Sequence, residues 1–566
     1  MNDYITNTKL INEYYQQSLR KIKLTTAENM FHFDVYIYLT IIPLFIFHTT
    51  MIRVYNTLSK TKEEFKTVKP DEVGIYLCGP TVYKPSHIGH MVGPVIFDTI
   101  KRYLSYNGYR VNLVINITDV DDKLIAEANA RKIPMVAVAE EMTADYMRNL
   151  DTMNVKNSVN HFPKVSENID NIIKFTQDLI DKGVAYESEG DVYFNVSRFS
   201  EYGKLSHRLL EQMTGEGGGM ANRKQTPFDF ALWKSAKPDE PSWDSPWGKG
   251  RPGWHIECSV MSRELLGETF DIHGGGLDLV FPHHENEIAQ SEARHEKPMC
   301  HFWMHNGLMQ ASSEIGKVGG RKTRTAEEGN IESQETDKIS KSKGASAFRD
   351  MLKQFEPETI RFFLLSSHYR RPIDFSFERI EEVGKGLETF YRFTKRFEKI
   401  TGHDFYYLAA AVNRTEGDQA IDKATLSVPE LAEYRTKFLE SMDDDFNTGA
   451  AIGVLFDLLR VLNKYIDDHK LETESESLNN YQTPLIHGAT VLRELGLTLG
   501  LFHHPPKEKT NAGSDELVHK LMGLLLELRA AARKNKDFAT ADKIRKDLAE
   551  FGITLEDRPE GTEWKI

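Results

Sequence analysis

The stretch EVGIYLCGPTVYKPSHIGH, residues 72–90, decides the fold class of this chain. Its beginning, residues 72–79, is a short apolar run that ends in glycine, which is typical of a buried strand in a parallel sheet. Residues 90–109 carry apolar side chains at helical spacing, and an Asn-Gly pair marks the end of that helix. Residues 110–123 are rich in β-branched side chains and predict the next strand. The order strand, helix, strand is the unit of a doubly wound α/β domain with a parallel sheet.

The composition bounds the number of domains and the class of partner. A chain of 566 residues predicts roughly three or four domains, and 40% hydrophobic with 27% charged residues is ordinary for a soluble globular protein. The net charge of -13 excludes a strongly basic coat for non-specific nucleic-acid binding, although a local basic face can still bind RNA. Three cysteines are too few for a disulfide framework in so long a chain, so we expect a reducing, cytoplasmic location.

An apolar run, DVYIYLTIIPLFIFH at residues 34–48, precedes the first predicted domain. The run is shorter than the ~20 residues that a membrane helix needs, and Pro43 interrupts it. It also lacks a small-residue cleavage site, which disfavours a signal peptide and leaves a weak signal-anchor as the alternative. We expect Met51 to open the first soluble domain and residues 1–50 to be an extension or an upstream start, without a membrane partner.

Two later stretches differ from their surroundings in composition. Residues 204–253 are rich in Gly, Lys, Pro and Trp and predict an ordered loop, because tryptophans are not expected in a flexible linker. A second α/β region follows from about residue 254 to 380, and inside it residues 312–337 are polar, charged and free of aromatic side chains. That composition predicts a disordered or surface insertion.

From about residue 383 onward the pattern becomes helical. Residues 515–552 predict two helices that end at Gly552, and lysines and arginines concentrate there. The tail ITLEDRPEGTEWKI predicts a hairpin with an exposed aromatic side chain, Trp564. The sequence therefore predicts α/β domains first and an all-α C-terminal region after them.

The segment His87-Ile88-Gly89-His90 lies between the first predicted strand and its helix. Folds of this type bind nucleotides at the carboxyl end of such a strand, where the helix N-terminus offers free N–H groups to a phosphate. Gly89 lets a ligand approach the backbone, and two imidazoles can donate hydrogen bonds to an oxyanion as charge builds up. Taken alone, the segment is equally well explained as a structural turn with two surface histidines.

A second motif, KISKSKG at residues 338–344, places three lysines and two serines in one loop. Lysines at this density are what a triphosphate or a leaving pyrophosphate needs, although a solvated basic loop is the usual explanation of such a run. The two motifs, in this order within one Rossmann-like chain, resemble the paired signatures of class I aminoacyl-tRNA synthetases.

A third constellation has the chemistry of a metal site. Cys258 lies in RPGWHIECSVM, and downstream His283 and Glu287 are four residues apart, on one face of a predicted helix. With Cys78 these side chains make a Zn²⁺ donor set, although the spacing is not that of a zinc finger. The alternative is two buried cysteines packed as small hydrophobic residues beside ordinary polar side chains of a helix.

The wider sequence is similar to the cysteinyl-tRNA synthetase family from about residue 51 to the end. Besides the motifs above, the stretches that carry this resemblance are NITDVDDKLI (116–125), FDFALWK (228–234), FDIHGGGLDLVFPHHENEIAQSEA (270–293), LSSHYRRPIDFS (365–376), MDDDFNT (442–448) and GTEW (561–564). Together these motifs are long and highly specific.

The resemblance implies one zinc ion per chain at the bottom of the amino-acid pocket, with Cys78, Cys258, His283 and Glu287 as its ligands. Such an enzyme must distinguish cysteine from serine and alanine, and an apolar pocket discriminates so small a change by only ~1–3 kcal/mol. Soft sulfur binds Zn²⁺ in preference to a hydroxyl oxygen, so a zinc–thiolate bond selects cysteine without an editing domain. Cys300 matches no ligand, and we expect it to be structural.

The resemblance also implies ATP with Mg²⁺ and L-cysteine as substrates, which form cysteinyl-adenylate before cysteine passes to the 3′ end of tRNA-Cys. His87 and His90 are expected to stabilise charge on the phosphates, and Lys341 with Lys338 to hold the leaving pyrophosphate. Residues expected to bind the nucleotide are Gly89, His273, Gly275, Asp278 and Lys341, and those expected in the amino-acid pocket are Thr118 and Trp254.

The family pattern predicts a monomer with the following division: an extension at 1–50, a class I catalytic Rossmann-like domain with a connective insertion and the zinc site at 51–380, a stem-contact helical bundle at 381–510, and a small anticodon-binding domain at 511–566. The sequence departs from the pattern at Ile339, Ala345 and Gly449, where the family has methionine, asparagine and proline.

Two other functions remain open. The first is a cysteine ligase of mycothiol synthesis, which shares the catalytic core but uses no tRNA; the basic C-terminal helices and Trp564 argue against it, because they resemble an RNA-binding region. The second is a non-catalytic tRNA-binding paralogue, which would be expected to lose phosphate-binding residues that this chain retains.

Overall fold

The computed structural model describes residues 51–208, 221–238, 240–311, 347–424, 430–473, 475–507, 512–558 and 561–565. The apolar run 34–48, the insertion 312–337 and the lysine motif with Lys338 and Lys341 lie outside the described residues. No helix in the described part of the chain is long and apolar enough to cross a membrane.

A four-stranded parallel sheet forms the centre of the α/β part, as predicted. Its strand order is β10-β9-β3-β4, with β3 at Glu72–Leu77, β4 at Arg110–Ile115, β9 at Phe270–Gly276 and β10 at Cys300–Asn306. The chain passes from β3 to its neighbour β4 on one side and later returns to β9 on the other side of β3. The strand order therefore reverses between β3 and β9, and ligands of such sheets bind in the crevice beyond the carboxyl ends of strands at this point.

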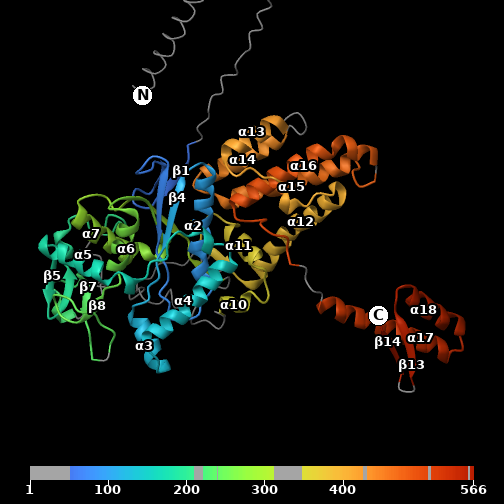
Figure 1. Cartoon of the computed structure of the whole chain (residues 1–566), viewed down its shortest axis with the longest axis horizontal. Helices are drawn as coiled ribbons and strands as arrows, with labels where there is room; N and C mark the ends of the chain where they lie inside the picture. The colour runs from blue at the N-terminus through green and yellow to red at the C-terminus, as the bar shows by residue number, and fades with distance from the viewer. Residues whose placement is uncertain are drawn as a thin grey trace, which may run out of the picture. The chain divides into compact units, whose positions relative to one another are not determined.

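Helices cover both faces of this sheet (Figure 1). The predicted helix after β3 is α2, Gly89–Tyr106, which packs on one face, and α6, Ile256–Leu266, packs on the other. Successive side chains of a strand point to opposite faces, so Ile75 and Leu77 join the core on the α2 side while Tyr76 joins the core on the α6 side.

The second predicted strand is shorter than expected. It ends at Ile115, whereas the prediction extended to residue 123. The last residues of the predicted strand belong instead to α3, Asp122–Arg131, which the Asp121 carboxylate caps by accepting a hydrogen bond from the backbone N–H of Lys123. Two more helices follow before the next sheet, α4 at Met135–Thr152 and α5 at Ile169–Asp181.

An antiparallel sheet lies between β4 and β9 in the chain, where a connective insertion was predicted. It consists of β5 (Ala185–Ser188), β6 (Asp191–Phe194), β7 (Phe230–Ser235) and β8 (Gly250–Pro252). The prediction of a loop over 204–253 was therefore wrong for β7 and β8. Trp233 of β7 is fully buried, and a Cβ on Gly253 would lie 1.9 Å from the Ala231 carbonyl oxygen, so only glycine permits this close pairing.

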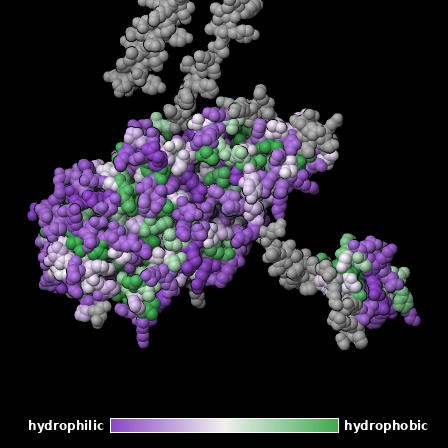
Figure 2. Space-filling model, in the orientation of Figure 1, coloured by the Kyte–Doolittle hydropathy of each residue, from purple (hydrophilic) through white to green (hydrophobic). Residues whose placement is uncertain are grey.

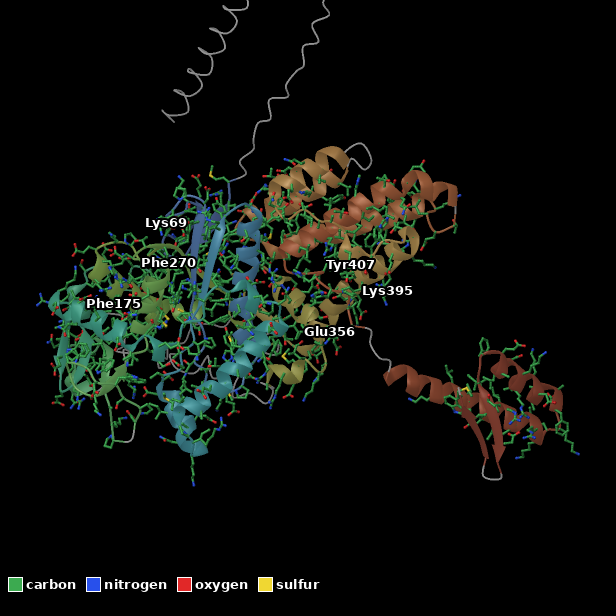
Figure 3. The ribbon with its side chains drawn as sticks, viewed as in Figure 1. Lys69, Phe175, Phe270, Glu356, Lys395 and Tyr407 are labelled. Atoms are coloured by element: carbon green, nitrogen blue, oxygen red, sulfur yellow. The ribbon has the colours of Figure 1, made fainter. Side chains whose placement is uncertain are left out.

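The core of the α/β part falls into two clusters of buried side chains. One joins α2 to the helices that follow the sheets; the other joins the opposite face of the parallel sheet to the insertion, and it includes Phe270 of β9 and Phe175 of α5 (Figure 3). On the visible surface of the described residues, hydrophilic side chains dominate and apolar ones form small groups (Figure 2).

The region after the sheets is helical, as predicted. Its helices are α10 (Phe348–Met351), α11 (Pro357–Leu365), α12 (Phe377–Thr401), α13 (Arg414–Ala424), α14 (Glu430–Asp443), α15 (Thr448–Asp468) and α16 (Ser475–Thr498). A short parallel pair, β11 (Met309–Ala311) with β12 (Ile373–Phe375), connects it to the end of β10. A hairpin of β1 (Arg53–Asn56) and β2 (Thr61–Glu64) opens the described chain.

The last body of the chain has its own small core. It consists of α17 (Ala512–Lys534), α18 (Phe538–Glu550) and the predicted hairpin, β13 (Thr554–Arg558) with β14 (Gly561–Lys565). Trp564 was expected to be exposed, but it is half-buried and packs against the cluster of Met522, Leu548 and Leu555. The two amphipathic helices supply the apolar partners that the hairpin needs.

Buried polar contacts join α2 to the helical region. The Tyr103 hydroxyl donates to the Asp443 carboxylate at 2.5 Å, and the Tyr106 hydroxyl donates to Glu494. Arg361 of α11 is 2% exposed and bonds the Leu499 carbonyl oxygen at 2.8 Å. Its guanidinium also pairs with the fully buried Asp98 of α2, so each buried charge has a partner.

Candidate functional site

Three chain segments meet at the carboxyl ends of the central strands. Cys78 follows β3 directly, and its backbone N–H donates to the Gly274 carbonyl of β9 at 3.1 Å. The N–H of the next residue, Gly79, donates to the Asn116 side chain at 2.8 Å, and Asn116 follows β4. Cys78 therefore lies at the reversal point of the sheet, where a ligand crevice is expected.

The structure brings the four side chains of the predicted zinc set together. Cys258 comes from α6, His283 from the π-helical turn Val280–His284, and Glu287 from α7, Glu285–His295. The Cys78 Sγ lies 3.7 Å from the Cys258 Sγ and 3.6 Å from the Glu287 Oε1. Such distances are close to those between ligands of a tetrahedral ion with Zn–S bonds of about 2.3 Å. Two sulfurs, an imidazole and a carboxylate are also a donor set that suits Zn²⁺.

A further histidine belongs to this cluster. The ligand atoms of Cys78, His283, His284 and Glu287 lie within 4.8 Å of one another, and His284 Nε2 is 3.2 Å from the Cys78 Sγ. The other ring nitrogen of His284 is 2.8 Å from His305. The prediction named only the first histidine of the pair, because the helical spacing that relates His283 to Glu287 gives no reason to include its neighbour.

Neighbouring groups favour the ionised forms of Cys258 and Glu287, whereas burial and these two neighbours raise the pKa of Cys78 well above its usual value. Burial raises the pKa of Cys258, but the hydrogen bond from the Cys78 thiol and the adjacent His283 outweigh it and lower that pKa to about 6. Burial likewise raises the pKa of Glu287, yet His273 and His283 hold it well below its usual range. The chain thus already stabilises one thiolate and one carboxylate, whereas a bound divalent cation would have to displace the protons of Cys78 and His283, whose pKa values are raised in its absence, that of His283 to about 10.

Neighbouring side chains orient the proposed ligands. His283 Nε2 lies 2.7 Å from the Glu287 Oε1, and its Nδ1 lies 3.0 Å from His255. The Trp254 ring stacks on His283 with 4.4 Å between ring centroids, and Trp254 itself is 40% exposed. Partners that hold the second nitrogen of a ligating histidine set its tautomer and its direction.

His87 and His90 lie together at the start of α2, as predicted. Their rings stack with 3.8 Å between centroids, and the Gly89 N–H donates to the His87 Nδ1 at 3.1 Å. Burial, with the charges of His87 and Lys123, lowers the pKa of His90 to about 3, so His90 is neutral at pH 7. A neutral imidazole at a helix N-terminus can donate one hydrogen bond to a phosphate oxygen without losing its proton.

The residues predicted to bind the nucleotide or the amino acid differ in burial and in contacts. His273 is fully buried, and its Nε2 lies 2.9 Å from the Glu287 Oε2, so in this structure it contacts the ligand cluster. Thr118 is also buried and donates to the Glu257 carboxylate at 2.9 Å. Gly275 lies against His284, where a Cβ would be 2.7 Å from the ring, and Asp278 is exposed just beyond β9.

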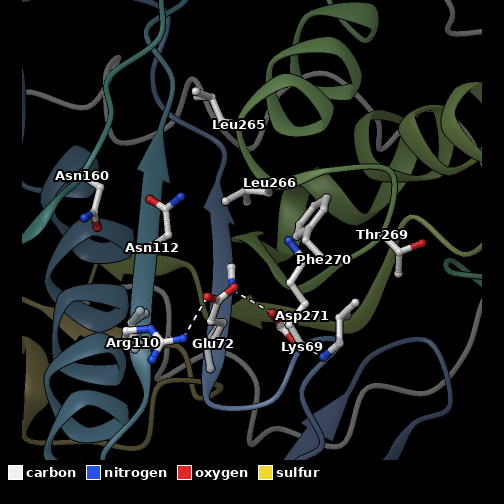
Figure 4. Close-up of a pocket in the computed structure, with 14 residues that line it drawn as sticks. Lys69, Glu72, Arg110, Asn112, Asn160, Leu265, Leu266, Thr269, Phe270 and Asp271 are labelled. Atoms are coloured by element: carbon white, nitrogen blue, oxygen red, sulfur yellow. Dashed lines mark hydrogen bonds and ion pairs between the residues drawn. The ribbon is translucent and has the colours of Figure 1, made fainter.

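A separate cavity of about 490 Å³ lies at the opposite, amino ends of β3, β4 and β9 (Figure 4). Arg110 and Glu72 form an ion pair of 2.9 Å at its edge. The buried Asp271 carboxylate accepts backbone N–H bonds from Val68 and Gly74. None of the predicted site residues lines this cavity.

Family models match three parts of the chain. The model described as tRNA synthetases class I (C) catalytic domain matches residues 64–317 and 327–385. The DALR domain model matches residues 437–503, and the Cysteinyl-tRNA ligase anticodon binding domain model matches residues 524–564.

Curated relatives and solved structures agree with these matches. The Cysteine--tRNA ligases of Geobacillus thermodenitrificans and Geobacter metallireducens are each 43% identical to the chain, over 516 and 524 residues, and each match covers 91% of the chain and 99% of the relative. A solved structure of Mycobacterium tuberculosis methionyl-tRNA synthetase in complex with methionyl-adenylate shares the fold, with a TM-score of 0.54, 13% identity and coverage of 76% of this chain and 91% of that one. The family that the motifs predicted is thereby confirmed: the chain belongs to the cysteine–tRNA ligases of the class I aminoacyl-tRNA synthetases.

Proposed function

We propose that this chain activates L-cysteine with ATP and transfers it to tRNA-Cys, selecting the amino acid through one bound Zn²⁺. The observation that carries the proposal is the cluster of two thiols, an imidazole and a carboxylate just after β3, in which Cys78 is half-buried and the other three are buried. It lies at the carboxyl end of the sheet in a chain whose family relatives are cysteine–tRNA ligases.

In this proposal Cys78, Cys258, His283 and Glu287 hold the ion. When bound, Zn²⁺ supplies a site for the substrate thiolate that a hydroxyl or methyl group cannot occupy equally well. The chain's own part is to keep Cys258 and Glu287 ionised and to direct His283 through its contact with His255. Trp254 limits access of water to His283 by stacking on its ring.

The nucleotide is proposed to lie next to this cluster, because Cys78 and His87 belong to one short connection after β3. His87 and His90 would donate hydrogen bonds to phosphate oxygens as charge develops during attack by the cysteine carboxylate on the α-phosphate. Lys338 and Lys341 are proposed to hold the leaving pyrophosphate, with Mg²⁺ bound to ATP. Gly275 and Asp278 are proposed to line the adenosine site, and Thr118 the amino-acid pocket.

The test has two stages. Cysteine-dependent exchange of radiolabelled pyrophosphate into ATP reports activation, and attachment of labelled cysteine to tRNA-Cys reports transfer. Exchange without transfer would favour the cysteine ligase that uses no tRNA. Absence of both would favour the non-catalytic tRNA-binding paralogue.

The metal assignment is tested by a matched pair of cysteine variants. Cys258→Ser should lose bound zinc, measured by metal analysis of the purified protein, whereas Cys300→Ser should retain about one zinc per chain. Cys300 is an equally buried cysteine whose thiol faces the Phe302 carbonyl oxygen, so the pair separates loss of a ligand from loss of a core thiol. Full zinc content in Cys258→Ser would exclude this ligand set.

Oligomeric state and location complete the proposal. We infer a monomer in the cytoplasm, in line with the three free thiols among the described residues. Sedimentation equilibrium should then give a mass near 64.8 kDa for the full chain, and a mass twice as large would contradict the monomer.

A further inference from the structure

A cleft of about 550 Å³ lies where the loop after α11 meets the start of α15 and the β1–β2 hairpin. Four basic side chains line it: Lys62, His368, Arg370 and Arg371. Two serine residues, Ser366 and Ser367, and the first turn of α15 complete the lining, and no carboxylate from the described residues lines it. We call this feature the basic cleft. A lining of donors and cations without carboxylates is the composition of an anion site.

A buried carboxylate behind the wall of the cleft fixes two of these basic side chains. Asp445 is fully buried and accepts hydrogen bonds from the Tyr369 hydroxyl at 2.8 Å and from the Arg370 Nε at 2.7 Å. The His368 Nε2 lies 3.4 Å from the same carboxylate. The Arg370 guanidinium also lies 4.2 Å above the Tyr55 ring. The Asp445 carboxylate therefore lies behind the basic cleft, while the His368 and Arg370 side chains that it contacts lie at the surface of the cleft.

Arg371 is the arginine of the basic cleft whose side chain has no partner among the described residues. Its side chain is exposed and makes no hydrogen bond or ion pair with any described residue. Lys62, by contrast, pairs with the exposed Asp444 at 2.7 Å. The first turn of α15 adds partial positive charge to the same side of the basic cleft. A guanidinium with all its donors free can bind two oxygens of one phosphate.

Backbone contacts place the basic cleft at the same end of the sheet as the candidate site. The Gly307 N–H, just after β10, donates to the Tyr369 carbonyl oxygen at 2.8 Å. The Ile373 N–H of β12 donates to the Leu308 carbonyl oxygen at 3.0 Å. The loop that carries the cations is thus tied to the carboxyl end of β10. No lining residue belongs to the segments that build the zinc and nucleotide positions, so the basic cleft is a separate site.

We propose that the basic cleft binds phosphodiester groups of the tRNA backbone, with Arg371 as the direct contact. The proposal rests on the proposed function, because it identifies where the polyanionic substrate of that reaction touches the junction of the α/β part and the helices. A phosphate contact of this kind positions the nucleic acid without reading its sequence. The same chemistry could come from the phosphates of ATP, and the experiment separates the two sources.

The experiment compares Arg371→Ala with Arg460→Ala in the full-length, zinc-loaded protein. Arg460 is a matched control, since it is an exposed arginine on α15 that pairs only with Asp457 of its own helix among the described residues. Arg371→Ala should raise the KM for tRNA about tenfold and lower the slope of log KM against log salt concentration by about 1. Cysteine-dependent ATP–pyrophosphate exchange should keep its kcat and its KM for ATP. Arg371→Lys, which keeps the charge, should recover part of the loss.

Three results would contradict the assignment of the basic cleft to tRNA. A KM for tRNA within twofold of the parent in Arg371→Ala would overturn the proposal, and so would an equal effect of Arg460→Ala. A raised KM for ATP in the exchange reaction would assign the basic cleft to nucleotide phosphate instead of tRNA. Absence of exchange in the parent protein would be a failure of the proposed function, which the exchange arm detects independently of tRNA.

Discussion

Replacing Gly79 by alanine should damage the metal site through the backbone alone. Gly79 follows Cys78, and a Cβ at this position would lie 1.7 Å from the Asn116 carbonyl oxygen and 3.2 Å from an Ile115 methyl group. The obstacle is the backbone just after β4, which cannot move aside as a flexible side chain can. Gly79 is therefore required because two parallel strands end in contact, and its φ plays no part.

The magnitude follows from these distances. Cβ atoms essentially never come within 3.0 Å of another heavy atom, so the two segments must separate by at least about 1.3 Å. Inserting one carbon into a packed core typically costs 1–3 kcal/mol, and a clash with rigid backbone places Gly79→Ala near about 3 kcal/mol. The same shift moves the Cys78 thiol by several times the ~0.2 Å tolerance of a zinc–ligand distance. We therefore expect Gly79→Ala to lose both stability and zinc.

The assay is urea unfolding followed by tryptophan fluorescence, together with metal analysis of the folded variant. Gly453→Ala is the matched control, because Gly453 is exposed within α15 and a Cβ there meets nothing within 4 Å. That control should gain about 0.5–1 kcal/mol from the higher helix propensity of alanine. If the free energy of unfolding of Gly79→Ala lies within 0.5 kcal/mol of that of the parent and the variant retains its zinc, then backbone contact does not require glycine at this position.

Three further predictions concern charged and polar groups. Arg361→Leu should lower the free energy of unfolding in urea by about 3–5 kcal/mol, because among the described residues it leaves the buried Asp98 with a single ion-pair partner, Arg102. A loss below 1 kcal/mol would contradict this. Burial raises the pKa of Asp98, but Arg361 and Arg102 hold it below its usual value, so its contribution to stability is complete above about pH 4 and is lost as the pH falls through the lowered pKa. Acid unfolding followed by circular dichroism should accordingly begin at a higher pH in Arg361→Leu than in the parent. His90→Ala should lower the kcat of ATP–pyrophosphate exchange about 100-fold. His90→Asn keeps an N–H donor and should lower that kcat less. Equal losses in the two variants would argue against hydrogen-bond donation by His90.

Local patterns predicted the elements that depend on local spacing. The run ending at Gly79 and the helix after His90 follow from apolar periodicity, and both appear as β3 and α2. The meeting of His283 and Glu287 follows from their separation of four residues. That Cys78 and Cys258 lie in contact required the family pattern, because 180 residues separate them and no local rule brings them together.

The predictions were wrong or incomplete where contacts between distant residues, or irregular backbone, determine the structure. Strands β7 and β8 lie in a stretch rich in glycine and proline, and they form because Gly253 permits a contact with β7 that no periodicity reveals. His284 lies in the turn Val280–His284, where Phe281 has a non-helical backbone, so regular helical spacing does not predict its place in the cluster. The burial of Trp564 depends on α17 and α18, whose apolar faces the tail sequence does not contain.

Helix α2 has a consequence for how the two halves of the proposed reaction depend on each other. Its 18 residues span about 27 Å, with His90 at one end and Tyr103 and Tyr106 anchored to α14 and α16 at the other. Because α2 is one continuous helix, we expect a displacement at its anchored end to be passed along its axis to the other end. Occupancy of the helical region by tRNA and occupancy of the α2 N-terminus by ATP should therefore be thermodynamically linked, each changing the affinity for the other by the same factor.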